Sequence, residues 1–336
     1  GPKVANPVDN MKDFFQTGVA YNNNFSINAG GERTTVRASI GNLRQSGIDP
    51  NTEFKRTSVR VNTDTRLTNK ISFGSSINFI NSGGTRAQNG SNLSGVMLSI
   101  LRSPVDFNLR GGQGEDFWKN PDGSNYTYLP FYDNPYWSAY ENPFTDDVNR
   151  ILGNTYITYR PLDWIDVTYR VGIDQYTDTR KQVFAVGSNQ PDNAPGGEIN
   201  ENIQRYKEFY SDLLITARRE LNEDLNLNVI LGNNLNNRFS SDQFLRGRDL
   251  AIPDFYNLSN ASNLYASSGT GRVKTAAMYL NAELAYKSML YLNVTGRNEW
   301  ASTFGTAKSS FFYPSANASF VFTEAIGNNN ILSYGK

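Results

Sequence analysis

Apolar and polar residues alternate one by one through several segments of the chain. In residues 57–67, Val59, Val61 and Leu67 occupy odd positions, whereas Arg60 and Asp64 occupy even ones. Successive side chains of a β-strand point to opposite faces, so this period predicts strands with one apolar and one polar face. We predict strands near residues 22–30, 33–43, 53–67, 71–81, 150–160, 165–177, 204–218, 225–236, 271–287, 290–300 and 311–323.

The charged residues of these segments keep to one face. Arg37, Asp64, Arg170 and Glu283 all have the polar parity, and the apolar parity of the alternating segments carries no charge. A Lys or Arg that faces lipid at mid-bilayer costs about 2–4 kcal/mol, so a membrane barrel would exclude charges in this way. A soluble β-sandwich would also keep charges off its inner face, and this feature alone does not separate the two.

The lengths of the connections distinguish a membrane barrel from a soluble β-sandwich better than the charges do. Short links (residues 30–32, 68–70, 161–164, 219–224 and 288–289) alternate with long ones (44–52, 82–149, 178–203, 237–270 and 301–310). Outer-membrane barrels have short periplasmic turns and long outer loops. Tyr159, Trp164 and Trp300 lie at strand ends, where aromatic girdles occur. The chain is therefore expected to be all-β, forming about 11–12 strands of an antiparallel transmembrane β-barrel.

Composition excludes several classes of function. Lys plus Arg and Asp plus Glu are 32 each, and a neutral chain is not expected to bind nucleic acid. Cys and His are absent, which removes disulfides, histidine-dependent triads and ordinary zinc sites. We therefore expect no enzyme, no metal and no cofactor. The composition leaves open a passive porin or adhesin barrel and a soluble β-rich binding module.

The loop at residues 104–149 combines many aromatic side chains with carboxylates. Loops of this length in a compact domain are usually functional or disordered. Three roles stay open for it: contact with a substrate, contact with a partner protein that covers it, and packing within the loop itself. The candidate contact residues are Trp118, Tyr126, Tyr128, Tyr132, Tyr136 and Trp137.

Two shorter motifs border or interrupt this loop. Residues 91–103 have apolar residues at helical spacing and stop before Pro104, which predicts a short helix over the loop base rather than an amphipathic membrane helix. Asp122 to Asn125 resembles a calcium loop only faintly, because the spaced acidic ligands and the closing Glu are missing. A Pro121-Asp122-Gly123 turn is the better interpretation.

Two blocks of short motifs occur in a defined order along the chain. The first block comprises Phe15–Gly18, Asn24–Ser26, Gly30–Gly31, Ser39–Gly41, Gln45–Gly47, Lys55–Arg56 and Val61–Asn62. The second runs from Arg297 to Gly305 and is followed by Tyr313-Pro314-Ser315. The order of these motifs resembles that of the SusC/RagA family of TonB-dependent outer-membrane transporters. The second block departs from the family signature at Glu299, Ala301 and Tyr313.

The resemblance implies a multi-pass protein of the bacterial outer membrane with a plug inside a barrel of 22 strands. It also implies import of oligosaccharides or oligopeptides, energy supplied by the TonB–ExbB–ExbD complex, and a SusD-like surface lipoprotein as a lid. Residues 1–336 are then expected to be a partial barrel domain with its long outer loop at 82–149, lacking the plug and the C-terminal strands. Lumen residues facing the plug or substrate would be Arg37, Arg60, Asp64 and Arg170, together with Asn62, Arg66 and Asp174.

Overall fold

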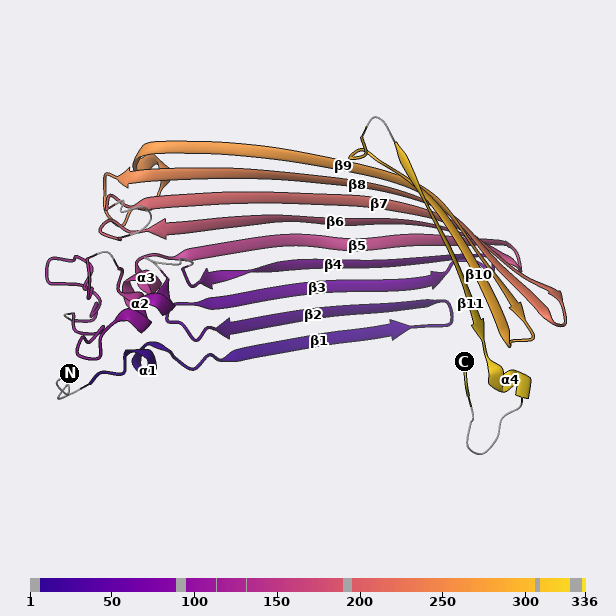
Figure 1. Ribbon diagram of the computed structural model, residues 1–336, viewed down its shortest axis with the longest axis horizontal. Coiled ribbons are helices and arrows are strands. Elements are labelled where there is room, and N and C mark those ends of the chain that lie inside the picture. Colours follow the sequence, from indigo (N-terminus) through magenta and orange to yellow (C-terminus); the bar gives the residue numbers. More distant parts are fainter. Residues whose placement is uncertain are drawn as a thin grey trace.

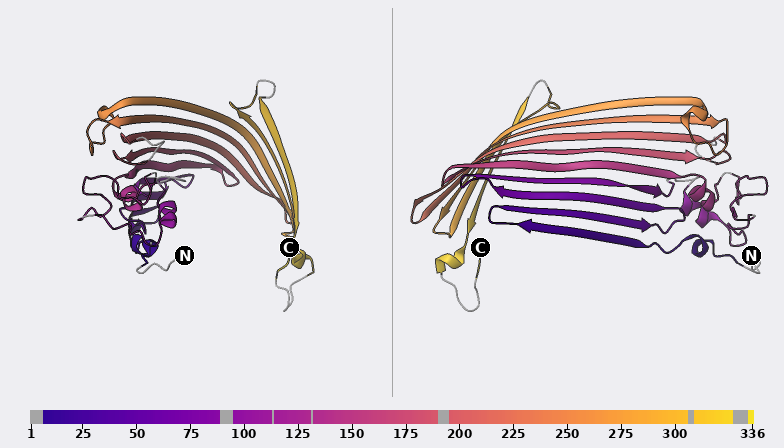
Figure 2. Two further views of the ribbon diagram at one scale, coloured as in Figure 1. Left: turned by 60° about the vertical axis from the view of Figure 1, so that its left-hand side comes forward. Right: turned by 180° about the vertical axis from the view of Figure 1, so that it is seen from behind.

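The computed structural model describes residues 7–88, 95–112, 114–130, 132–189, 195–305, 309–326 and 334–336. In this part of the chain one antiparallel sheet holds eleven strands in sequential order, β1 to β11. The strands are β1 Ala20–Gly30, β2 Thr34–Ser46, β3 Glu53–Arg66, β4 Ile71–Arg86, β5 Phe144–Leu162, β6 Ile165–Phe184, β7 Glu198–Asn222, β8 Leu225–Leu250, β9 Ala261–Tyr286, β10 Leu290–Ala301 and β11 Ser310–Phe320. The sheet curves into an arch (Figure 2).

The helices gather mainly at one end of the sheet (Figure 1). Helix α1 (Asn10–Phe14) precedes β1, and α2 (Val96–Arg102) and α3 (Pro135–Tyr140) lie in the long connection between β4 and β5. A 3-10 turn, η1 (Leu258–Asn260), precedes β9, and α4 (Phe322–Ile326) follows β11 at the other end of the sheet. Short turns therefore lie at one end of β1–β9, and the long connections with the first three helices lie at the other.

The predicted strands are all present, but several are longer than predicted. Strands β7, β8 and β9 reach Glu198, Leu250 and Ala261 at the loop end, so much of the predicted links 178–203 and 237–270 is paired strand. The alternation of apolar and polar residues stops before these strands end. The hydrogen-bonded ladder continues beyond it, because backbone groups still need partners. β11 ends at Phe320, before the predicted residue 323, and the chain continues into α4.

The pairing register gives the sheet one apolar and one polar face. Val59 pairs with Phe79, and Phe79 pairs with Ile151, so these side chains share the apolar face. Large side chains of this face are exposed, for example Leu231 at 43% and Val294 at 58%. The described strands thus enclose no apolar core between packed sheets, which is what a soluble sandwich would require.

Both edge strands are paired on one side only. β1 pairs with β2 and β11 pairs with β10 in the register of the described residues. β11 contains Pro314, whose backbone lacks an N–H donor, and such residues are tolerated on edge strands. Free edges cannot face lipid, because each unpaired backbone group would cost several kcal/mol there.

Candidate functional site

The register places the four predicted lumen residues on the polar face. Arg37 on β2 pairs with Asn62 on β3, two positions from both Arg60 and Asp64. Asp64 pairs with Gly74, Gly74 pairs with Tyr156, and Tyr156 pairs with Arg170, which continues the same row across to β6. Their contact with a plug or substrate stays a prediction.

Hydrogen bonds link polar side chains of neighbouring strands on this face. The Arg60 guanidinium donates to Asn62 Oδ1 at 3.0 Å and to the hydroxyl of Ser76 at 3.3 Å. The Tyr156 hydroxyl on β5 donates to Asp64 on β3 at 2.7 Å, across the intervening β4. These contacts connect polar side chains of β3, β4 and β5 on one face of the sheet.

Ion pairs run along the same face toward the loop end. Asp174 joins Arg150 at 2.5 Å, and Glu208 joins Arg238 at 3.0 Å. Asp174 is one of the predicted lumen residues, whereas Arg150, Glu208 and Arg238 are not. All three occupy even-numbered positions, as Arg170 does, but lie beyond the apolar part of their strands. This shared parity is the sequence signal that could have identified them.

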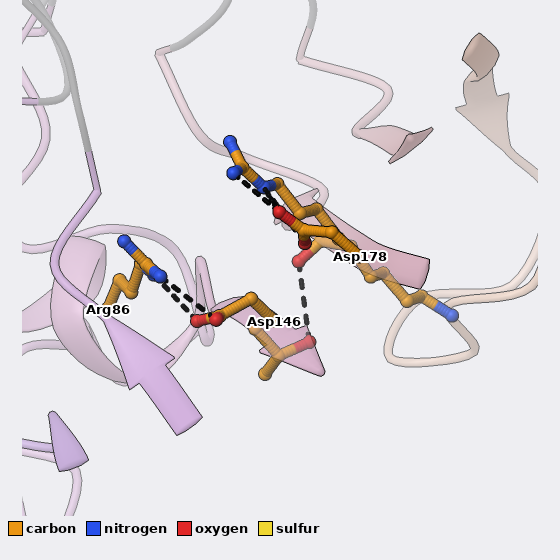
Figure 3. A network of polar contacts seen from close by, with 6 residues as sticks. Arg86, Asp146 and Asp178 are labelled. Atoms are coloured by element: carbon orange, nitrogen blue, oxygen red, sulfur yellow. Dashed lines mark hydrogen bonds and ion pairs between the residues drawn. The ribbon is translucent and has the colours of Figure 1, made fainter. Parts of the chain in front are cut away.

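Figure 3 shows a second polar network, which includes Arg86, Asp146 and Asp178 on strands β4, β5 and β6. Arg86 at the end of β4 donates two hydrogen bonds to Asp146 on β5, at 2.6 and 2.9 Å, while Arg180 binds Asp178 on β6. The Asp146 side chain is 2% exposed. Hydrogen bonding to this carboxylate raises the pKa of Arg86. The charges of this end of the polar face are thus largely neutralised by one another.

The largest cluster of buried apolar residues in the described chain lies in the helices and loops at one end of the sheet. Phe14 of α1 packs edge-on against Tyr136 of α3, and the Tyr136 hydroxyl donates to the backbone oxygen of Asp13 at 2.7 Å. Trp118 stacks on Tyr140 with ring centroids 4.4 Å apart. The cluster of buried apolar residues is Phe14, Val96, Ile100, Leu109, Trp118, Tyr136, Trp137, Ala139 and Ala185. We call this assembly, with the polar residues it encloses, the loop cluster.

A buried carboxyl group organises the polar part of the loop cluster. Asp133 Oδ1 accepts hydrogen bonds from the Asn125 amide and the Asn189 backbone, both at 2.8 Å. Burial raises the pKa of Asp133 to about 7, although these donors favour the ionised form. Nearby, Asn142 accepts hydrogen bonds from the Ser188 hydroxyl and the Ala185 backbone. These contacts tie α3 to the connection after β6.

The six predicted loop aromatics divide into two groups. Trp118, Tyr136 and Trp137 are at most 8% exposed, and the Trp137 indole donates to Ser188 at 2.8 Å. These three are buried in the loop cluster, and their contact with a substrate or a partner protein stays a prediction. Tyr128 is 41% exposed, and Tyr126 and Tyr132 are partly buried. Tyr140, which the sequence analysis did not select as a contact, is 40% exposed and presents its ring beside Trp118.

The remaining predicted motifs of this loop are partly described. Helix α2 confirms the predicted helix from Val96 onward, and its predicted start at residues 91–94 lies outside the described residues. Asp122 caps the turn by accepting from the Ser124 backbone at 3.0 Å, as expected of a turn. No cluster of three or more acidic side chains able to hold a metal occurs in the described residues. No described helix is long and apolar enough to cross a membrane.

Comparison with known proteins gives a consistent set of relatives. No family model matches the chain. The TonB-dependent receptor P26 of Formosa agariphila is 24% identical over 327 residues, which cover 94% of this chain and 31% of that protein. The RagAB peptide transporter superposes with a TM-score of 0.81 at 17% identity, covering 96% of this chain and 36% of that one. The ferric citrate transporter FecA gives 0.54 at 8% identity, with 91% and 38% covered. The chain thus spans about a third of the length of its relatives, and its fold is that of one section of their barrels.

Proposed function

We propose that this chain, a section of a SusC/RagA-type TonB-dependent transporter, forms part of the outer-membrane barrel wall through which oligosaccharides or oligopeptides are actively imported. The single observation that carries the proposal is the two-faced sheet. Its apolar face is exposed over a continuous belt, and its polar face is lined by mutually neutralised ion pairs.

The apolar belt is sized for a bilayer. On β8 it extends from Leu225 to Leu235, and on β10 it extends from Leu290 to Trp300. Transmembrane β-strands need about 9–11 residues. Trp164 lies at the turn end of the belt and Trp300 at the loop end, in the positions of aromatic girdles. The belt therefore faces lipid, with the short turns in the periplasm and the loop cluster outside.

The free edges of β1 and β11 require additional strands in the membrane. Closing the sheet would satisfy their unpaired backbone groups, and a family-sized barrel would supply both partners. Its plug would fill the space beside Arg37, Arg60, Asp64 and Arg170. The polar face would then bind the plug in the resting state and line the route of the substrate when the TonB–ExbB–ExbD complex displaces it.

The loop cluster is the proposed contact surface for a SusD-like lipoprotein and for the substrate. It is rigidly packed inside by Trp118, Tyr136 and Trp137, and it exposes Tyr128 and Tyr140. Rigid loops with exposed aromatic rings offer stacking area to sugars and peptides at a low entropic cost. A tagged full-length transporter should co-purify with a surface lipoprotein; recovery of the transporter alone under native extraction would contradict this partnership.

Uptake by a deletion strain complemented with the full-length gene tests the transport proposal. We expect uptake of labelled oligopeptides or oligosaccharides to require the gene and to stop when a protonophore collapses the proton gradient. Uptake that is insensitive to the protonophore would indicate a passive porin. Recovery of the full-length protein in aqueous buffer without detergent would indicate a soluble module.

A further inference from the structure

Four cations gather on the apolar face at the loop-side margin of its belt. Lys207 on β7 and Arg272 on β9 both pair in register with Phe239 of β8, which lies between them. Arg205 and Lys274 lie two positions away on the same two strands and on the same face. All four side chains are exposed. We call them the cationic cluster.

The cationic cluster has no acidic partner among the described residues. Arg205 donates to the amide of Gln243 at 2.9 Å, and the Arg272 guanidinium lies over the Phe239 ring at 5.4 Å. Acidic residues on this face are engaged elsewhere: Glu201 pairs with Lys181 at 3.4 Å, and Asp147 accepts from Asn81 and Asn149. This differs from the polar face, where most cations are paired, and it leaves a net positive surface.

Two apolar hollows adjoin the cationic cluster on the same face. One, of about 640 Å³, is lined by Phe209, Leu235, Trp300 and the small Ala276, and Lys274 is also among its lining residues. The other, of about 360 Å³, is lined by Phe79, Ile151 and Phe239, with Arg205 and Lys207 at its margin. Each hollow thus combines an apolar interior with a positive margin, which is the pattern that an anionic amphiphile fits.

We propose that this surface binds a phosphorylated glycolipid of the outer leaflet. Its acyl chains occupy the two hollows, and its phosphate groups bind the cationic cluster. Lys and Arg that face a membrane surface attract anionic headgroups, and phosphate accepts charge-assisted hydrogen bonds from both residue types. Because the long loops lie outside the cell, the cluster stands at the level of the outer leaflet. The inference rests on the membrane orientation proposed above.

Binding of purified diphosphoryl lipid A to the full-length transporter in detergent tests the proposal. The triple substitution Lys207→Gln, Arg272→Gln and Lys274→Gln should weaken binding about 100-fold, since each membrane-facing cation contributes on the order of fivefold. Ala276→Phe, which fills the larger hollow and keeps every charge, should weaken binding as well. Dephosphorylated lipid A and phosphatidylglycerol should each bind more weakly than diphosphoryl lipid A.

A matched control removes three cations from the opposite rim. Lys70, Arg219 and Lys287 lie at or beside the short turns, and their replacement by Gln should leave binding unchanged. Wild-type affinity in the first triple variant, or equal binding of phosphatidylglycerol, would overturn the proposal. Heat-modifiable migration of each variant on gels verifies that it is folded. Uptake is measured on the same variants, so that a failure of transport is distinguished from a failure of lipid binding.

Discussion

The ring of Tyr156 on β5 occupies the space above Gly74 on β4, so closely that a Cβ atom on Gly74 would lie 2.4 Å from the ring. The Tyr156 hydroxyl reaches across β4 to Asp64 on β3. The same relationship recurs between Gly172 and Tyr210 and between Gly232 and Tyr279. On the polar face, a missing side chain on one strand thus admits an aromatic ring from the next.

We expect Gly74→Ala to destabilise the barrel. The added methyl group must displace Tyr156 and break its hydrogen bond with Asp64; such overpacking typically costs about 1–3 kcal/mol. Gly31→Ala is the matched control, because nothing lies within 4 Å of a Cβ there. The free energy of unfolding in urea measures both, and equal values for the two variants would show that the Tyr156 ring yields without cost.

A charge on the apolar face should be costly at the level of the belt. Leu231 on β8 pairs with Ile215 and Leu280 on the same face. Leu231→Arg should reduce the free energy of unfolding in lipid vesicles by about 2–4 kcal/mol. Asn228→Arg is the control, because Asn228 has the opposite parity and pairs with Glu283. If both substitutions cost the same, the apolar face does not contact lipid.

The ion pair between Arg86 and Asp146 should contribute more to the free energy of unfolding than a fully exposed pair. Arg86→Ala leaves the almost completely buried Asp146 carboxylate without its bidentate partner. Because the Arg86 side chain is about half exposed, we expect a loss of about 1–3 kcal/mol rather than the larger penalty of a fully buried pair. Lys287→Ala, which removes the exposed pair with Asp224, should leave the free energy of unfolding nearly unchanged. Chemical denaturation of the two variants measures the difference.

The loop cluster should lose stability as pH rises through the titration of Asp133. Its pKa is raised from 3.8 to about 7 by burial, so the folded loop binds a proton that the unfolded loop releases. The stability linked to this group is complete below about pH 4, falls between pH 4 and pH 7, and is constant above. The total change is on the order of 4 kcal/mol.

Asp133→Asn should remove this pH dependence. Hydrogen exchange of the loop amides between pH 4 and pH 8, corrected for the intrinsic exchange rate, measures it. Asp106→Asn serves as the control, since Asp106 is an exposed residue of the same loop. A wild-type loop whose protection is equally strong at both ends of this range would refute the role of Asp133.

Substitutions of two loop aromatics should distinguish a residue that packs the loop from one that contacts substrate. Trp137 is 3% exposed, and Trp137→Ala should cost about 3–5 kcal/mol of local stability. Tyr128→Ala should leave stability nearly unchanged and lower substrate uptake if Tyr128 stacks on substrate. Proteolysis of the loop reports the first effect, and uptake kinetics report the second. Unchanged uptake in Tyr128→Ala would remove this residue from the proposed contact surface.

The residue pattern alone determined the fold class, the existence of the strands and their two faces. Period-two alternation is a local property, because a residue such as Val59 or Arg60 lies on the apolar or the polar face according to its parity alone. The alternation of short and long links followed from the antiparallel order, and the resemblance to the SusC/RagA family rested on motifs that are local as well.

The tertiary structure decided what depends on contacts distant in sequence. Strands β7 to β9 extend beyond the belt because neighbouring backbones pair there, where side-chain hydrophobicity gives no signal. Trp118 and Trp137 are buried and donate hydrogen bonds to Glu141 and Ser188, partners that are distant in sequence. The cationic cluster also emerges only from the register, since Lys207 and Arg272 become neighbours of Phe239 through pairing across three strands. The burial of a side chain and the charges around it depend on contacts between strands, and no single segment of the sequence contains that information.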